Sequence, residues 1–150
     1  MTTIAYKDGI LASDSRMTLG GMNAGSVVKI GYHPQFNIGL GLCGDAFSAG
    51  NALAWLKIAS ADDLIEGLQD ALGKHAEALL VDGTRQVFIV SGRGLIKIED
   101  KYSAIGSGAP YALAAMDAGA DVHQALKIAV KRDVYSGGRI RSVTLRSKKK

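Results

Sequence analysis

Two spacings of apolar residues alternate along the chain, and the first of them predicts a β-hairpin at its start. The segments 3–6 and 10–13 are rich in apolar and β-branched residues, as strands are. Between them lies Asp8-Gly9, a dipeptide favoured in two-residue hairpin turns because both turn residues need a positive φ. A two-residue turn at this point places Thr3 opposite Asp14. The start of the chain is therefore expected to lie beside a carboxylate.

The spacing of apolar residues also predicts the elements in the rest of the chain, because apolar residues alternate in strands and recur every three to four positions in helices. Further strands are expected at 26–32, 36–43, 78–81, 86–90, 95–98, 103–105 and 139–145. Helices are expected at 46–58, 64–72, 110–118 and 122–132. This order of strands and helix pairs suits an α+β fold, a four-layer α-β-β-α sandwich of two antiparallel sheets with helices on both outer faces.

The composition is that of one folded domain, residues 1–150. This length is enough to bury a core, and 47% hydrophobic with 21% charged residues argues against disorder. No apolar run approaches the ~20 residues that span a bilayer, and the start of the chain lacks the features of a signal peptide. A single cysteine, Cys43, cannot form an internal disulfide, which fits a reducing cytoplasm. We therefore expect a cytoplasmic protein without membrane contacts.

The positive charge is concentrated at the end of the chain. Six of the eighteen lysines and arginines lie in the last twelve positions, whereas the net charge of the whole chain is only +4. Residues 146–150 are predicted to form a solvated basic tail. Aromatic residues that could stack on bases do not alternate with these charges. Nucleic-acid binding is therefore not expected.

Thr2 is the residue with the most distinctive chemistry. If Met1 is removed, as is usual before a small residue, Thr2 carries both a hydroxyl and a free α-amine. An α-amine has an ordinary pKa of about 7.7–8.0, and a base that titrates near neutrality can activate a weak nucleophile. The stretch thus predicts an N-terminal nucleophile, although an ordinary edge hairpin that begins Met-Thr-Thr explains the same residues.

Six short segments, taken in order, match one known family. They are Thr2-Thr3-Ile4, Ala12-Ser13-Asp14-Ser15-Arg16, Val28-Lys29-Ile30, Leu40-Gly41-Leu42-Cys43-Gly44-Asp45-Ala46, 104–111 and 131–138. Together they resemble the proteasome β-subunits and the related bacterial peptidase subunit that works with an unfoldase, which are N-terminal-nucleophile (Ntn) hydrolases. The resemblance covers nearly the whole chain, and its last two segments are the most specific. The family has the four-layer sandwich predicted above.

The resemblance implies a catalytic role for six side chains. Thr2 would be the nucleophile, and its amine would accept the hydroxyl proton. Lys29 would favour loss of that proton through its positive charge, and Asp14 would keep Lys29 charged and oriented. The network that positions the amine and a water molecule would consist of Ser107, Asp133 and Ser136.

The resemblance also implies how the substrate is held. The backbone N–H of Gly41 would stabilise the oxyanion, with Gly44 as the alternative because the strand before it is short and the alignment can slide. Thr18 would pair with the substrate backbone, and Gly39 would leave a roomy specificity pocket. No cofactor or metal site follows from the residues, and a monovalent cation near 133–138 rests on family analogy alone.

The family further implies particular partners and a particular route to the mature protein. An unfolded polypeptide or peptide would be the substrate, a homo-oligomeric ring or stacked rings the assembly, and an ATP-dependent unfoldase a partner. The chain is shorter than usual, and Thr2 and Asp14 lie closer in sequence, which we interpret as a trimmed hairpin turn. No propeptide precedes Thr2 in the sequence, so removal of Met1 would suffice, whereas a retained Met1 would leave no free amine.

Two other interpretations stay open beside a cytoplasmic threonine endopeptidase that forms an acyl-enzyme on Thr2. One is an Ntn amidohydrolase for a small amide, which predicts a closed pocket and a small oligomer. The other is a non-catalytic ring-forming subunit, or a protein whose basic tail binds an acidic partner. This second alternative predicts a retained Met1 and no effect of Thr2→Ala.

Overall fold

The computed structural model describes residues 2–147, which form eleven strands and four helices. The strands are β1 (Ile4–Lys7), β2 (Ile10–Ser13), β3 (Arg16–Leu19), β4 (Met22–Ser26), β5 (Ile30–His33), β6 (Ile38–Gly44), β7 (Ala76–Val81), β8 (Val87–Ser91), β9 (Gly94–Ile98), β10 (Tyr102–Ile105) and β11 (Arg141–Thr144). The helices are α1 (Ala46–Leu56), α2 (Leu64–Leu72), α3 (Ala109–Asp117) and α4 (Val122–Arg132). None of these four helices combines the length and the apolar character needed to cross a membrane.

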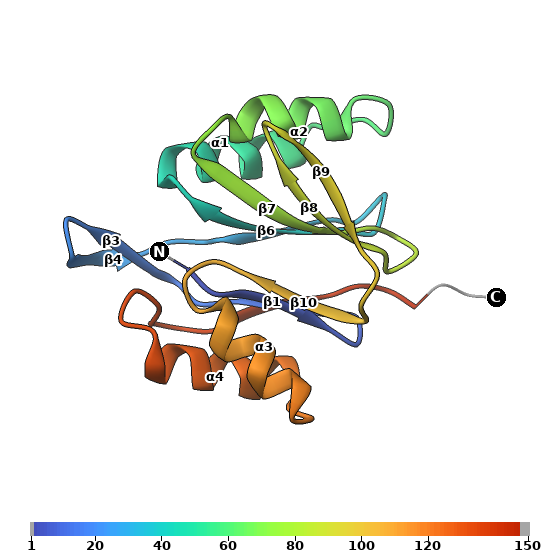
Figure 1. Cartoon of the computed structure of the whole chain (residues 1–150). Helices are drawn as coiled ribbons and strands as arrows, with labels where there is room; N and C mark the ends of the chain where they lie inside the picture. The colour runs from blue at the N-terminus through green and yellow to red at the C-terminus, as the bar shows by residue number, and fades with distance from the viewer. Residues whose placement is uncertain (1, 148–150) are drawn as a thin grey trace.

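The elements stack in four layers (Figure 1). One sheet has the strand order β10-β1-β2-β11 and the other the order β5-β6-β7-β8-β9, and all of these neighbours pair antiparallel. Helices α1 and α2 cover the outer face of the five-stranded sheet, and α3 and α4 cover the outer face of the four-stranded sheet (Figure 1). The predicted α-β-β-α sandwich is confirmed.

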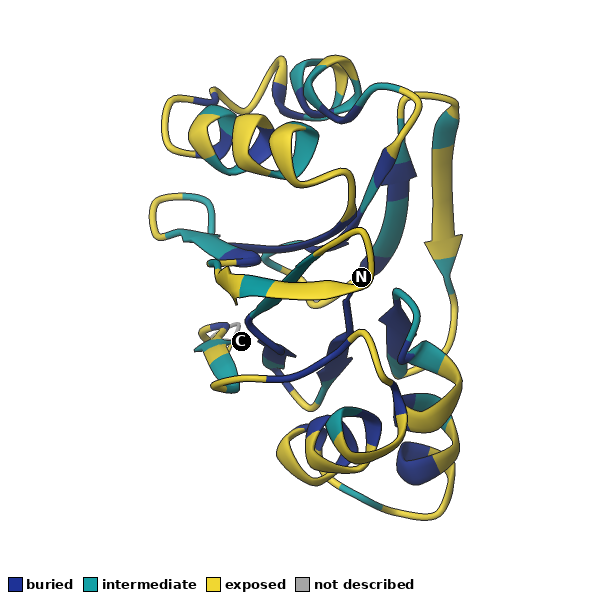
Figure 2. Cartoon of the chain, turned by 90° about the vertical axis from the view of Figure 1, so that its left-hand side faces the viewer, coloured by how far each residue is buried: buried dark blue, intermediate teal, exposed yellow. Residues whose placement is uncertain are grey.

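The opening hairpin follows the period of two that a strand buried on both faces requires. Ile4 and Leu11 lie in the core between the two sheets, whereas their neighbours Ala5 and Ala12 pack beneath α3 and α4. Small residues on that face let the helices approach the sheet closely. Figure 2 shows the result, with dark, buried strands at the centre and exposed residues on the outer helices.

The register of this hairpin is the predicted one. Lys7 pairs with Ile10, and the turn residues Asp8 and Gly9 have φ of 51° and 81°, as a type I′ turn requires. The N-terminus consequently lies at the end of the sandwich from which β3 and β4 project (Figure 1).

The predicted strand at 26–32 is wrong in its bounds. The chain instead forms the hairpin β3–β4, which ends at Ser26, and begins β5 only at Ile30. The turn of this hairpin is Gly20-Gly21, with φ of 56° and 78°. Two consecutive positive φ values are what a two-residue hairpin turn needs.

Only part of the predicted basic tail, 146–150, lies within the described residues. The backbone N–H of Arg146 donates to Asn37 Oδ1 at 2.9 Å, and its guanidinium donates to the carbonyl of Pro34 at 2.6 Å. Residues 148–150 and Met1 lie outside the described part of the chain.

Candidate active site

The β1–β2 hairpin places the first threonines beside Asp14. Just beyond the last strand pair, the N–H of Asp14 donates to the carbonyl of Thr3 at 3.2 Å. The N–H of Thr3 donates in return to Asp14 Oδ1 at 3.0 Å. Thr2, Thr3 and Asp14 are all buried. Local hairpin geometry therefore fixes how Thr2 sits relative to this carboxylate.

Asp14 and Lys29 form a buried ion pair. Lys29 Nζ lies 2.8 Å from Asp14 Oδ1, and the exposed fractions of the two side chains are 7% and 0%. The other carboxylate oxygen accepts from the N–H of Gly137 at 3.0 Å and of Arg16 at 3.3 Å. Burial lowers the pKa of Lys29, and the attraction and hydrogen bond of Asp14 oppose that shift. The carboxylate thus helps to keep a buried amine protonated beside Thr2.

A hydrogen-bonded chain connects the backbone nitrogen of Thr2 with a second carboxylate. Thr2 N donates to Ser107 Oγ at 3.2 Å, and Ser107 Oγ donates to Asp133 Oδ2 at 2.6 Å. Ser136 Oγ donates to the same carboxylate oxygen at 2.6 Å. Because the hydrogen of Ser136 points to Asp133, Thr3 Oγ1 is the donor in its 2.7 Å contact with Ser136. The network therefore holds Thr2 through its nitrogen and Thr3 through its hydroxyl.

Asp133 acts as the acceptor at the centre of this network. Burial raises its pKa, but hydrogen bonds from Ser107, Ser136 and the N–H of Tyr135 outweigh burial, so that the pKa lies below its ordinary value. The carboxylate is therefore ionised at neutral pH. An ionised carboxylate accepts from both serine hydroxyls and orients the lone pairs of Ser107 toward Thr2 N.

Close packing against Thr2 explains two glycines of the Gly106-Ser107-Gly108 segment. Gly106 has a φ of 95°, and a Cβ there would lie 2.1 Å from the carbonyl oxygen of Thr2. A Cβ on Gly108 would lie 1.8 Å from Thr3 Oγ1. The absence of side chains lets this loop touch the N-terminal backbone, and the N–H of Gly108 donates to the carbonyl of Thr2 at 3.2 Å.

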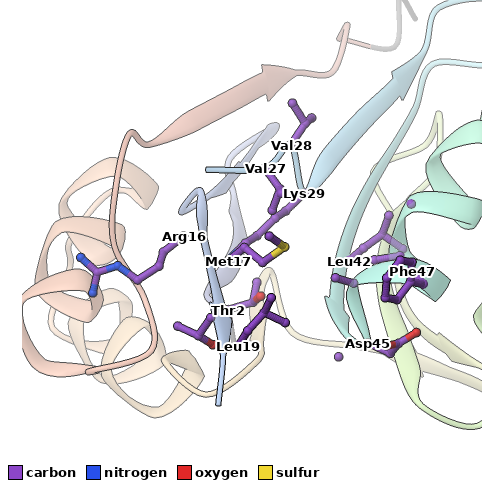
Figure 3. Close-up of a pocket in the computed structure, with 15 residues that line it drawn as sticks. Thr2, Arg16, Met17, Leu19, Val27, Val28, Lys29, Leu42, Asp45 and Phe47 are labelled. Atoms are coloured by element: carbon purple, nitrogen blue, oxygen red, sulfur yellow. The ribbon is translucent and has the colours of Figure 1, made fainter. Parts of the chain in front are cut away.

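A cavity of about 330 Å³ opens beside Thr2. It is lined by β3, the segment after β4, the end of β6 and the start of α1, through Thr2, Arg16, Met17, Thr18, Leu19, Val27, Val28, Lys29, Leu42, Gly44, Asp45, Ala46, Phe47, Ala49 and Gly50. Figure 3 shows Met17 and Leu19 on the β3 side, Leu42 and Phe47 on the opposite side, and the guanidinium of Arg16 pointing away. The cavity is mostly apolar, with the hydroxyl-bearing Thr2 and the buried ammonium of Lys29 in its wall.

The structure separates the predicted substrate-binding positions into two groups. Thr18 lies on β3 in the wall of the cavity. Gly39, expected to leave a roomy specificity pocket, lies in the inter-sheet core, where a Cβ would meet Leu11 and Leu145 at 3.2 Å. Its missing side chain makes room for core packing, so that expectation is corrected.

The two candidate oxyanion donors also differ in position. Gly41 lies inside β6 between Ile30 and Leu79, and a Cβ there would lie 2.3 Å from Ile4. It does not line the cavity, whereas Gly44, at the end of β6 with a φ of 102°, does. The position of Gly41 inside the sheet favours the alternative, Gly44, as the oxyanion donor.

Three contacts of the site were not anticipated from the sequence. They are the hydroxyl of Thr3 on Ser136, the N–H of Gly108 on Thr2 and the N–H of Gly137 on Asp14. Two of the three involve backbone groups, which leave no trace in residue type. Within residues 2–147, no group of three or more His, Cys, Asp or Glu side chains is arranged to hold a metal ion.

Comparison with known proteins identifies the family. No protein-family model matches the chain. The ATP-dependent protease subunit HslV of Pseudothermotoga lettingae is 32% identical, over 87% of this chain and 88% of that protein. The subunit of the same name from a Nitratiruptor species is 30% identical, over 96% of each.

Solved structures show the same fold. The eukaryotic HslV from Trypanosoma brucei superposes with a TM-score of 0.74 at 21% identity, over 97% of this chain and 99% of that one. Thiobacillus denitrificans BPH in complex with epoxomicin gives a TM-score of 0.67 at 23% identity, again over 97% and 99%. With the sequence matches, this likeness shows that the chain belongs to the HslV family of proteasome β-subunit-like threonine peptidases, within the Ntn hydrolases.

Proposed function

We propose that this threonine peptidase cleaves peptide bonds through an ester on Thr2, with the residue roles described below. One observation supports this most directly: Thr2 lies where the apolar cavity meets the hydrogen-bonded network on its own nitrogen. The nitrogen is a free α-amine once the residue before it is removed. A hydroxyl, a base and a substrate cavity then meet at one residue, as nucleophilic catalysis requires.

The first step would transfer a proton within Thr2. The α-amine accepts the proton of the hydroxyl, and the hydroxyl oxygen attacks the carbonyl carbon of the substrate. Lys29, held protonated by Asp14, favours the negative charge on that oxygen. The network through Ser107 keeps the lone pair of the amine oriented. The amine then returns the proton to the leaving nitrogen, and water hydrolyses the ester.

The backbone N–H of Gly44 is our candidate for the oxyanion donor. In β6 the N–H of Leu42 donates to the carbonyl of Lys29 at 2.9 Å. N–H groups alternate along a strand, so that of Gly44 points to the same side, past the beginning of β5, and toward the cavity. The N–H of Gly41 points by the same alternation to β7. Loss of one such donor typically costs about 10²–10³ in rate.

The shape of the cavity suggests which substrates are cleaved. Its walls offer Met17, Leu42 and Phe47 to a substrate side chain, which favours an apolar residue on the N-terminal side of the cleaved bond. The strand β3, which carries Thr18, lines this cavity and, within the described residues, pairs with β4. An extended substrate segment can add to the backbone of this hairpin. Unfolded polypeptides and peptides meet that requirement.

The partners and the location of the protein also belong to this proposal. The relatives are named as subunits of an ATP-dependent protease. We infer a homo-oligomeric ring that receives unfolded chains from an ATP-dependent unfoldase. A cytoplasmic location fits the single, unpaired Cys43.

The test is the intact mass of the purified protein before and after treatment with a peptide epoxyketone such as epoxomicin. We expect a mass that begins at Thr2 and one adduct per chain, absent in Thr2→Ala and retained in the neighbouring control Thr3→Ser. Burial raises the pKa of the Cys43 thiol to about 12, so the thiol does not compete for the reagent. A retained Met1 together with no adduct would refute the catalytic role of Thr2.

A further inference from the structure

A second cavity, of about 410 Å³, lies on the other side of Gly44 from the first. Gly44 lines both cavities. The rest of the second cavity is formed by residue 43, by 74–77 just before and at the start of β7, by Ser91 at the end of β8 and Arg93 in the following turn, and by 106–107. Ser107 is the residue to which Thr2 N donates. The second cavity therefore reaches the hydroxyl partner of the Thr2 nitrogen, whereas Thr2 itself lines the first, apolar cavity.

The proton transfers assign the two cavities to the two halves of a substrate. Accepting the proposed function, the α-amine of Thr2 must protonate the leaving nitrogen when the peptide bond breaks. The leaving group must then lie on the side of the amine. That nitrogen contacts Ser107, which lines the second cavity and not the first. The peptide segment after the cleaved bond thus extends toward the second cavity.

The charges of the second cavity are predominantly positive. Lys74 and Arg93 lie in its wall, both exposed, together with His75. Within residues 2–147, no carboxylate forms an ion pair with Lys74 or Arg93. The carboxylate in the wall, Glu77, is partly buried and accepts a hydrogen bond from the thiol of Cys43 at 3.6 Å. Among the described residues, the wall of the cavity therefore carries two cationic side chains without an ion-pair partner and one carboxylate that already accepts a hydrogen bond.

We propose that this second cavity binds the part of the substrate that follows the cleaved bond and selects an acidic side chain there. Lys74 and Arg93 attract the acidic side chain. Because Ser107 contacts the nitrogen of Thr2 and also lines this cavity, the substrate backbone passes the amine of Thr2 before it enters the cavity. The selection acts on residues after the cleaved bond, so it is independent of the apolar preference of the first cavity.

The test uses internally quenched peptides that are identical up to the cleaved bond and carry Glu, Gln or Lys at the first or second position after it. We expect the wild type to cleave the Glu peptide about three- to tenfold better than the Lys peptide in kcat/KM, a modest ratio because exposed charge pairs are screened by solvent. Arg93→Gln and Lys74→Gln should reduce this ratio, and Arg93→Glu should invert it. Lys97→Gln removes an exposed charge of β9 that does not line the cavity and should leave the ratio unchanged.

A substrate with an aminocoumarin directly after the cleaved bond separates this proposal from the proposed function. It has no residue to place in the second cavity, so the wild type and the Arg93 and Lys74 variants should hydrolyse it equally. Equal cleavage of the Glu and Lys peptides, with coumarin release intact, would overturn the acidic selection alone. Failure of the wild type to release coumarin or to form the epoxyketone adduct would overturn both proposals.

Discussion

Two hairpins follow one another at the start of this chain, and they differ in how deeply they are buried. The strands β1 and β2 lie in the middle of the four-stranded sheet, buried between the second sheet and two helices. Within residues 2–147, the strands β3 and β4 form a separate two-stranded sheet, and Leu19 and Met22 beside their turn are 56% and 62% exposed. Both turns have two residues and two positive φ values.

The difference shows that burial, and not turn chemistry, decides what each hairpin can do. A two-stranded hairpin is marginally stable by itself in water, so β3–β4 belongs to the part of the molecule that opens at low free-energy cost. The buried hairpin holds Thr2 and Asp14 at fixed positions, whereas the exposed hairpin leaves Leu19 and Met22 accessible. In the proposed mechanism, the catalytic groups lie on the buried hairpin and the substrate edge lies on the exposed one.

The largest effect is expected from removing the charge that the buried hairpin holds. Asp14→Asn leaves the ammonium of Lys29 buried without its carboxylate partner, and breaking a buried pair in this way typically costs about 3–5 kcal/mol. Activity should fall about 10³-fold or more, because the positive charge beside the hydroxyl is no longer held. Urea unfolding and peptide hydrolysis measure the two effects. In the exposed hairpin, Asn23→Ala removes a local hydrogen bond to Gly25 and is the matched control. Equal stability losses in the two variants would contradict the comparison.

The next effect tests how tightly the buried hairpin is held. Gly106→Ala places a methyl group 2.1 Å from the carbonyl of Thr2 at a φ of 95°, and we expect a loss of about 2–4 kcal/mol from overpacking and backbone strain. Gly119→Ala has a similar φ of 101° with no atom within 4 Å, so it reports the strain alone. Adduct formation with epoxomicin should be impaired only in Gly106→Ala, because a shift of Thr2 by about 1 Å can cost 10²-fold in rate. Normal labelling of that variant would show that Thr2 tolerates displacement.

A smaller effect is expected from the network on the nitrogen of Thr2. Asp133→Asn weakens the acceptor of two hydroxyl groups, and we expect a loss of about 1–2 kcal/mol at pH 7 and about 10²-fold in kcat. The pKa of Asp133 is lowered by folding, so its stabilisation is present above its ordinary pKa of about 3.9 and disappears as pH falls through the lower, folded value. Unfolding curves of the two proteins should therefore converge on acidification below pH ~4. A stability difference that persists at such low pH would exclude this role of Asp133.

The features that could be predicted from the sequence are those set by local geometry. The Asp8-Gly9 turn fixes the register of β1–β2, and that register alone places Asp14 beside the first threonines. By contrast, the residues 107 and 133 meet Thr2 only through the tertiary fold, and the resemblance to a family was needed to associate them.

The sequence is least informative where an offset along a strand decides the function. Gly41 and Gly44 are three residues apart on β6, so their N–H groups point to opposite neighbours, and residue type alone does not distinguish them. The fold of β6 places Gly39 and Gly41 against the other sheet, where Ile4 and Leu11 fill the space. Gly20-Gly21 is ambiguous for a related reason, because glycine suits both a loose connection and a tight turn.

The smallest effect should come from stiffening the exposed hairpin. Gly20 has a φ of 56° and no atom within 4 Å of its ideal Cβ position, and asparagine is favoured at this position of a type I′ turn. Gly20→Asn should stabilise β3–β4 by about 0.4–1 kcal/mol without changing global unfolding, because the hairpin opens by itself. If β3 binds substrate, KM should fall about two- to fivefold with kcat unchanged, and amide exchange at Leu19 and Met22 should slow. In the buried hairpin, a Cβ at Gly9, the second turn residue, would lie 2.6 Å from the guanidinium of Arg85, so Gly9→Asn should bring no gain. A change in kcat, and not in KM, for Gly20→Asn would show that the exposed hairpin takes part in the chemical step. The proposed difference in role between the buried and the exposed hairpin would then be wrong.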